Sequence, residues 1–220
     1  MSIHTYSFRS TSRQSIEEVV NTSTHALGLL LSIGGLAVLV VFASIVGTAS
    51  HIVGASIYGS TLVLVYAAST CYHWASSNGG KQSLRSAEQG VIFLFIAGTY
   101  TPFTLAVLGG GWGWSLLGVV WGLAIAGIIL NLIYSPRSSR STNFVFLGMG
   151  WLCLVAIGPL VASLPFIGLM WLLSGGIAYT LGVICLSINR IPVNHGIWHV
   201  LVLAGSTCHY FAVLFYVLPI

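Results

Sequence analysis

The sequence contains very few charged residues. Its 220 residues include 7 Lys and Arg and 3 Asp and Glu, so that 5% are charged, whereas 56% are hydrophobic. A soluble domain carries roughly a quarter charged residues, and a disordered chain needs low hydrophobicity and high net charge. The composition therefore excludes both classes, and the mean hydropathy of +0.97 indicates an integral membrane protein.

Basic residues are too few for a nucleic-acid-binding protein. The 7 Lys and Arg are scattered along the chain and form no cluster. Binding to nucleic acid depends on several basic side chains that neutralise phosphates together. We therefore expect no nucleic-acid partner.

Cysteine is also scarce. The chain has four cysteines, all inside apolar runs and without a CxxC pair. This spacing fits neither a disulfide framework nor a cysteine zinc site, and it favours small core residues. The residues are Cys71, Cys153, Cys185 and Cys208.

Long hydrophobic runs fill most of the chain. A helix needs roughly 20 residues to cross a hydrocarbon core of about 30 Å, and seven runs of this kind are separated by polar, turn-forming stretches such as SSNGGKQS and NRIPVN. The sequence predicts an all-α integral membrane protein with a seven-transmembrane helix bundle over residues 24–220, preceded by a polar cytoplasmic segment over residues 1–23. Because that segment lacks an apolar run, we expect no cleaved signal peptide. The predicted spans are residues 25–46, 52–74, 89–108, 112–134, 144–161, 166–188 and 195–217.

All seven basic residues fall on one side of the predicted membrane. Two precede the first span, two follow the second, two follow the fourth and one follows the sixth. Short cytoplasmic loops carry an excess of Lys and Arg, so the N-terminus is predicted to be cytoplasmic and the C-terminus outside. These residues are Arg9, Arg13, Lys81, Arg85, Arg137, Arg140 and Arg190.

In this topology, ionisable residues from three spans lie at the same depth, near the cytoplasmic side of the membrane. His73 ends the second span and Glu88 begins the third, while His195 and His199 begin the seventh, four residues apart on one helix face. Three neutral imidazoles that leave a fourth position for water make a suitable zinc shell. A carboxylate near them can hold or deprotonate that water. Ser69 lies one helical turn before His73 and faces the same way. The alternative is a set of interior histidines without metal, which is the commoner meaning of a lone His-x-x-x-His pair.

Four motifs then occur in order along the chain. They are Glu18-x-x-Asn21-x-x-x-His25, the string ASTCYH with Ser69 and His73, IAGTYTPF from Ile96 to Phe103, and NHGIWHVLVLAGSTCHY from Asn194 to Tyr210. Together they resemble the hemolysin III branch of the progestin and adipoQ receptor family, over nearly the whole chain. The likeness is closest to bacterial members, which are membrane-homeostasis proteins, and it implies a multi-pass protein of the bacterial inner membrane.

This resemblance implies a site as well as a fold. The family has seven helices with the N-terminus inside, and a zinc ion near the cytoplasm that three histidines hold, here His73, His195 and His199. Its relatives include receptors with ceramidase-like activity, and distant alkaline ceramidases share the pattern of one serine, one carboxylate and three histidines. The resemblance thus implies a membrane lipid as substrate or ligand, and Glu88 and Ser69 as catalytic residues.

Two details of the motifs leave alternatives open. Relatives usually have Asp-His where this chain has Glu88 and Gln89; glutamate keeps the charge and adds one methylene. Glu18, Asn21 and His25 lie on one stripe of the first span, and the resemblance makes them a second shell around the metal. Otherwise they form a helix start and interfacial cluster.

Three functions are compatible with these residues. The first is zinc-dependent hydrolysis of a lipid amide or ester, in which Glu88 acts on the attacking water and Ser69 donates to the oxyanion. The second is a non-enzymatic regulator or sensor of membrane state with a structural zinc. The third is a pore-forming hemolysin, although no span carries a repeated polar stripe that would line an aqueous path.

Overall fold

Seven helical segments in the described part of the chain are long and apolar enough to cross a membrane. The computed structural model describes residues 3–75, 81–134, 139–188, 190 and 193–219, and no strand occurs among them. The predicted seven-helix membrane bundle is therefore confirmed; the predicted breaks at residues 76–80, 135–138 and 191–192 lie outside the described residues. The elements are α1 Ile3–Val46, α2 Ala49–Trp74, α3 Lys81–Pro102, η1 Phe103–Leu108, α4 Gly110–Tyr134, α5 Ser139–Gly150, η2 Trp151–Ala156, α6 Ile157–Ser163, α7 Phe166–Ser187 and α8 Asn194–Tyr216.

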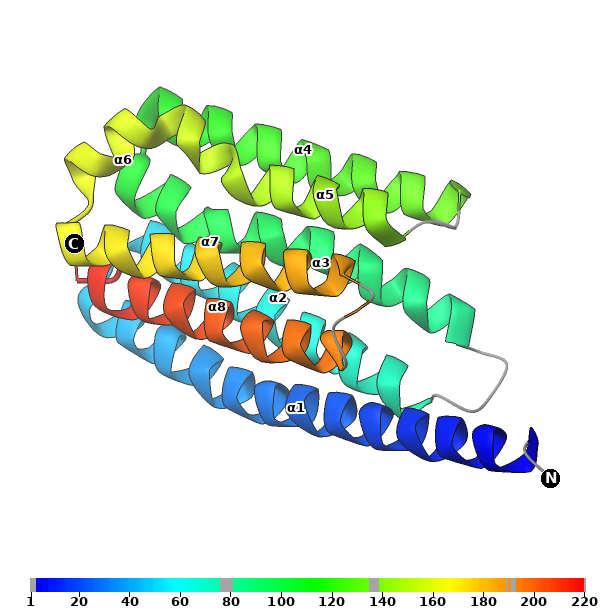
Figure 1. Ribbon diagram of the computed structural model, residues 1–220. Coiled ribbons are helices and arrows are strands. Elements are labelled where there is room, and N and C mark those ends of the chain that lie inside the picture. Colours follow the sequence, from blue (N-terminus) through cyan, green and yellow to red (C-terminus); the bar gives the residue numbers. More distant parts are fainter. Residues whose placement is uncertain (1–2, 76–80, 135–138, 189, 191–192, 220) are drawn as a thin grey trace.

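The first helix is much longer than a single membrane span. α1 has 44 residues, which correspond to about 66 Å, roughly twice the thickness of a hydrocarbon core. Its N-terminal part projects beyond the ends of the other helices (Figure 1). The polar segment over residues 1–23 contains neither glycine nor proline, so no residue in it favours a helix break.

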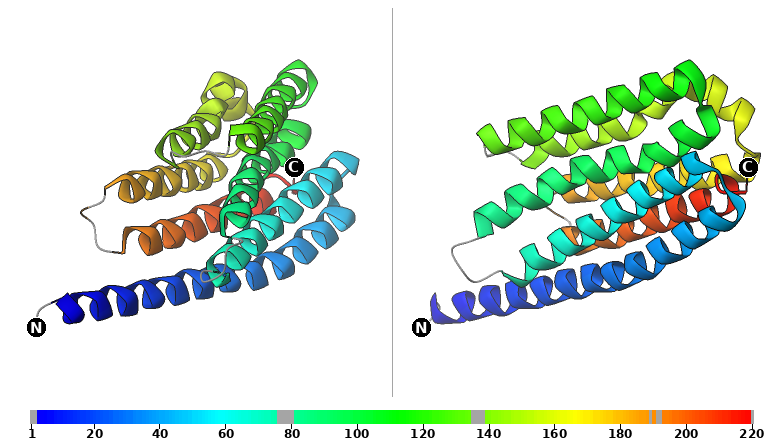
Figure 2. Two further views of the ribbon diagram at one scale, coloured as in Figure 1. Left: turned by 90° about the vertical axis from the view of Figure 1, so that its right-hand side faces the viewer. Right: turned by 180° about the vertical axis from the view of Figure 1, so that it is seen from behind.

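The helices form a ring that begins and ends next to α1. Helices α1 to α4 pack on one another in chain order, α5 packs on α3 and α7, and α8 packs on both α7 and α1. Figure 2 shows this order from two further sides. One hydrophobic cluster, with Leu39, Tyr58 and Val213, joins α1, α2, α3 and α8. A second cluster, with Phe93 and Val120, joins α3, α4, α5 and η2, so α3 lies between the two.

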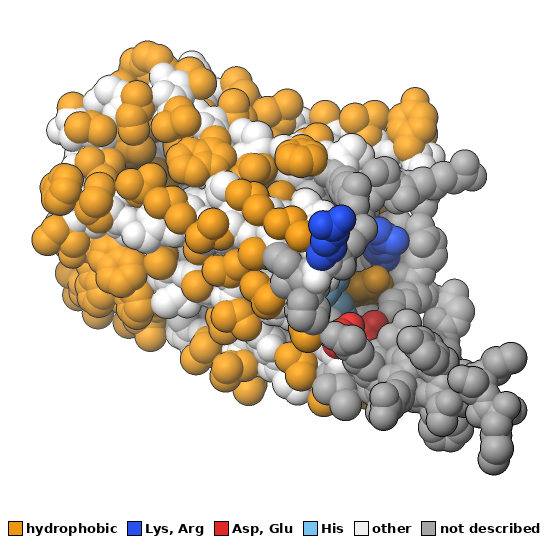
Figure 3. All heavy atoms as spheres, in the orientation of Figure 1, with side chains coloured by type: hydrophobic (Ala, Val, Ile, Leu, Met, Phe, Trp, Pro, Cys, Tyr) orange, Lys and Arg blue, Asp and Glu red, His pale blue; other side chains and the backbone are white. Residues whose placement is uncertain are grey.

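The outer faces of the helices are apolar. Leucine, isoleucine and valine side chains such as Leu132 and Ile45 are 69% and 74% exposed, as expected where lipid is the solvent. On the face drawn in Figure 3, the charged and histidine side chains gather at the end where α1 begins. The two termini lie at opposite ends of the bundle (Figure 1).

Two spans are irregular, and Tyr100 joins the irregularities. In the third span, Pro102 lies inside the helix, where it lacks the N–H that a regular helix needs, and it is followed by the π-helical turn η1. In the fifth span, the helix tightens to 3₁₀ geometry after Gly150. The Tyr100 hydroxyl lies 2.8 Å from the carbonyl oxygen of Met149 and 2.7 Å from that of Gly150, and it accepts a hydrogen bond from the Cys153 N–H at 3.0 Å. Tyr100 therefore binds the backbone groups at this change of helix type.

We expect Tyr100→Phe to destabilise the protein. Without the hydroxyl, one backbone N–H and at least one carbonyl lose their partner in an apolar interior, which costs about 1 to 3 kcal/mol. The free energy of unfolding in detergent measures this loss. Tyr134→Phe, at a side chain that is 73% exposed, is the control; equal stability of both variants and wild type would contradict the assigned role.

The distribution of basic residues predicts that the C-terminus lies outside the cytoplasm. A reporter fused after Ile220 is expected to be active only if it works outside the cytoplasm, because all seven Lys and Arg lie on the opposite side of the predicted membrane. Reporter activity measured in intact cells tests this. A cytoplasm-dependent reporter that is active at the same position would reverse the orientation.

Candidate metal centre

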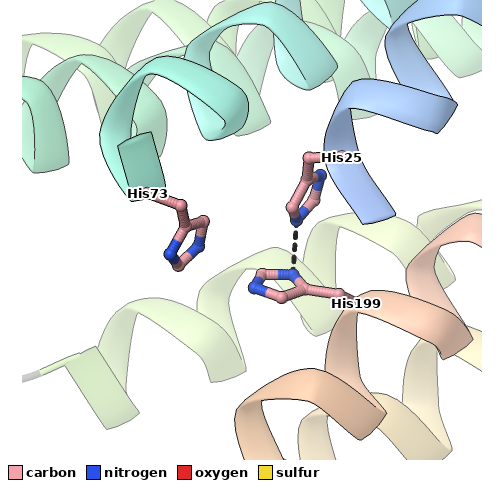
Figure 4. Close-up of side chains that lie close together, drawn as sticks. All are labelled: His25, His73 and His199. Atoms are coloured by element: carbon pink, nitrogen blue, oxygen red, sulfur yellow. Dashed lines mark hydrogen bonds between the residues drawn. The ribbon is translucent and has the colours of Figure 1, made fainter. Parts of the chain in front are cut away.

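Three histidines from three helices meet inside the bundle. His25 of α1, His73 of α2 and His199 of α8 are all buried, and one potential ligand atom from each lies within 4.8 Å of the others. The His199 ring is close to both of the others: its centroid is 4.0 Å from that of His25 and 4.8 Å from that of His73. Figure 4 shows the three rings converging from their helices.

Hydrogen bonds occupy one nitrogen of each of the three rings. His73 Nδ1 lies 2.8 Å from the Glu18 carboxylate, and His199 Nδ1 lies 2.5 Å from His25 Nε2. The opposite nitrogens, His73 Nε2 and His199 Nε2, are buried and have no hydrogen-bond partner in the described structure. A buried polar atom without a partner is costly, so the two Nε2 atoms fit a metal ion as their partner.

A fourth histidine adjoins this group. His195 lies one turn before His199 at the start of α8, and its ring centroid is 4.4 Å from that of His199 and 5.1 Å from that of His73. The sequence prediction combined His73, His195 and His199. The structure places all three near one another and adds His25, which the sequence analysis put in a second shell.

The remaining motif residues of α1 lie next to the histidines. Asn21 is buried, one turn before His25, and its Oδ1 has no partner in the described structure. His25 Nδ1 also lacks one. The two atoms are a potential acceptor and donor on the same helix face. The three motif residues of α1, Glu18, Asn21 and His25, thus all lie within or next to the histidine group.

A serine and a carboxylate form a pair beside the histidines. The Ser69 hydroxyl of α2 donates to Glu88 Oε1 of α3 at 2.7 Å. Ser69 is buried and lies one turn before His73. The structure thus brings together the two residues that the sequence analysis assigned to catalysis.

A cavity of about 490 Å³ begins at these residues. His25, Ser69, Glu88 and His199 are among its lining residues, and most of the other lining side chains are apolar, with Phe95, Phe103 and Leu169 as examples. Cavities of this size and lining typically bind small organic molecules through apolar contact and orient them by a few polar groups. This cavity therefore suits an elongated apolar ligand with one polar end.

Comparison with known proteins places the chain in a family. A family model for haemolysin-III-related proteins matches residues 13–210. The chain is 43% identical to a protein named hemolysin-3 from Bacillus cereus, covering 92% of this chain and 93% of the relative. It is also 42% identical to a hemolysin-3 homolog from Bacillus subtilis (strain 168), over 91% of this chain and 94% of that one. A more distant relative is the human monocyte to macrophage differentiation factor, which is 29% identical over 90% of this chain and 83% of its own. No solved structure matches. The chain belongs to the haemolysin-III-related family of multi-pass membrane proteins.

Proposed function

We propose that this protein is a zinc-dependent hydrolase of lipid amides or esters that acts in membrane lipid homeostasis. One observation carries the proposal: His25, His199, Ser69 and Glu88 line the same cavity as a long series of apolar side chains. A lipid chain held in the apolar part would present its polar end to the histidines. The ceramidase-like relatives implied by the sequence motifs support the same substrate class.

Zinc fits the side chains that are present. Imidazole nitrogens suit zinc and several transition metals, and a catalytic zinc site has three protein ligands and one open position. We assign the ligands to His73, His195 and His199. Metal-bound histidines usually donate their other N–H to a carboxylate or another acceptor, and here Glu18 holds His73 Nδ1 while His25 holds His199 Nδ1. His25 thus orients the ring of His199 as Glu18 orients the ring of His73.

Ser69 and Glu88 supply the proton chemistry. Zinc, when bound, supplies a Lewis acid that polarises a carbonyl and makes water more acidic. Glu88 takes the proton from the attacking water and gives it to the amine or alcohol that leaves when the C–N or C–O bond of the substrate breaks. The Ser69 hydroxyl, which donates to Glu88 Oε1 in this structure, is released once that carboxylate carries a proton, and it then donates to the oxyanion that forms on the substrate.

A second function is favoured by the fourth histidine. The four rings of His25, His73, His195 and His199 come from α1, α2 and α8 and lie next to one another. A closed shell of four protein ligands is typical of structural zinc. In that case the metal would join these helices, and the protein would sense or regulate the state of the membrane without turnover.

Zinc content of purified variants tests the ligand assignment. Removal of one imidazole of three leaves an incomplete shell, so His73→Ala, His195→Ala and His199→Ala are expected to lose nearly all zinc. Glu18→Ala and His25→Ala remove only an orienting group and should weaken affinity about 10- to 100-fold. Metal analysis of detergent-purified protein and a competition titration with a chelator measure both effects.

The control for this series is His209→Ala, on the same helix as His199 but outside the histidine group, which should retain zinc. Full zinc in His195→Ala together with none in His25→Ala would contradict the assignment. The ligands would then be His25, His73 and His199.

Glu88→Gln separates catalysis from structure. The amide keeps an oxygen that can accept from Ser69 but cannot act as a base, so zinc should stay bound while hydrolysis falls by about 10²-fold or more. Release of fatty acid from defined ceramide and phospholipid substrates by zinc-loaded protein measures activity. Glu88→Asp, which restores the residue usual in relatives, should keep measurable turnover.

The other outcomes decide between the two functions. Loss of zinc in Glu88→Gln would make Glu88 a direct ligand and favour the structural site. If wild-type protein hydrolyses neither ceramide nor phospholipid, the hydrolase proposal is removed.

A further inference from the structure

The cavity contains a second polar position far from the histidine group. His209 of α8 lines the same cavity as His199. It follows His199 by ten residues, which corresponds to about 15 Å along the helix, or roughly half of a 30 Å hydrocarbon core. The lipid chain in the proposed function would pass this side chain near its middle.

The hydrogen bonding of His209 leaves one nitrogen as an acceptor. Its Nε2 lies 3.3 Å from the carbonyl oxygen of Leu172 on α7. A carbonyl can only accept, so Nε2 carries the hydrogen, and in a neutral imidazole Nδ1 then has a free lone pair. Nδ1 is buried and has no partner in the described structure. The atom needs a donor.

Two glycines leave room for the rings of His209 and Tyr179 between α7 and α8. A Cβ at Gly175 would lie 2.5 Å from His209 Nε2, and a Cβ at Gly205 would lie 2.8 Å from the ring of Tyr179. The rings of Tyr179 and His209 contact each other, with centroids 5.4 Å apart. His209 thus fills a position between α7 and α8 that any larger residue at Gly175 would obstruct.

Neighbouring hydroxyls do not supply the missing donor. Ser206 Oγ donates to the Val202 carbonyl at 2.9 Å, so it accepts from both Tyr66 at 3.0 Å and Tyr179 at 3.1 Å. The hydrogen of the Tyr179 hydroxyl is therefore directed at Ser206. His209 Nδ1 therefore remains an acceptor without a donor among the described residues, on a side chain that lines the cavity.

We propose that the cavity binds a lipid whose chain carries a hydroxyl group near its middle, and that this hydroxyl donates to His209 Nδ1. A plain hydrocarbon chain would leave the nitrogen buried and unpaired, and a keto group would present a second acceptor. A site with a buried polar atom discriminates against ligands that cannot pair with it. The inference rests on the lipid-binding part of the proposed function and is independent of hydrolysis.

Competitive binding of three fatty acids tests this. The probes are one long-chain saturated acid, the same acid with a hydroxyl near the middle of the chain, and the same acid with a hydroxyl beside the carboxyl. Zinc-loaded wild-type protein in detergent is expected to bind the mid-chain hydroxy acid about three- to tenfold more tightly than the other two, which is the range of one net hydrogen bond.

Variants of His209 assign the preference. His209→Phe keeps a ring but removes the acceptor. The mid-chain hydroxy acid and the plain acid should then bind equally, and the affinity for the plain acid should be retained. His209→Gln keeps an acceptor oxygen and should restore part of the preference. If His209→Phe does not fold, His209→Gln takes its place. Tyr210→Phe is the matched control, because the Tyr210 hydroxyl donates to the Gly35 carbonyl at 3.2 Å on α1; it should bind as wild type does.

The outcomes separate this inference from the proposed function. Equal binding of all three acids by wild type, or a preference that survives in His209→Phe, overturns the inference and leaves the lipid-binding cavity in place. Binding of none of the acids overturns both. Selective binding without turnover of any lipid supports the inference and removes only hydrolysis.

Discussion

Hydrocarbon offers no hydrogen-bond partners, and the polar groups inside this bundle are arranged under that constraint. Tyr100 satisfies backbone groups where the fifth span changes helix type, and Ser206 joins the hydroxyls of Tyr66 and Tyr179. Among the described residues, seven buried side-chain atoms lack a partner, and five of them are histidine nitrogens. Because four of these five belong to histidines that line or adjoin the cavity, the unmet hydrogen bonding is concentrated where a metal or ligand would bind.

The cavity depends on how the helices divide the core. Two hydrophobic clusters share α3, one formed with α1, α2 and α8 and the other with α4, α5 and η2. The cavity is lined by residues of α3, of the fifth span and of α7 and α8, so it lies where these groups of helices adjoin. The irregular third and fifth spans border it, and Tyr100 ties them together. Helix irregularity here shapes an internal space.

Hydrogen bonds to histidines on other helices explain why a polar motif lies at the start of the first membrane span. Glu18 and His25 each hold one nitrogen of a histidine on another helix, His73 on α2 and His199 on α8. Fixing one nitrogen determines which nitrogen faces a metal. The same pairs would serve a catalytic or a structural ion, because both need the rings fixed; the difference lies in whether a fourth position stays open.

The sequence by itself determined the membrane location and the seven helices, since hydrocarbon thickness sets a span length that can be read from hydrophobic runs. It also placed His73, Glu88, His195 and His199 at one depth, because topology and helix rise are local properties of the chain. It did not show that α1 continues to Ile3, nor that the fifth span is broken and the third contains a π-helical turn. Only the tertiary structure showed that His25 contacts His199 and that the Glu18 carboxylate is hydrogen-bonded to His73. Those contacts depend on the rotation and register of α1 against α2 and α8, which side-chain packing between distant segments decides and helical periodicity alone leaves open.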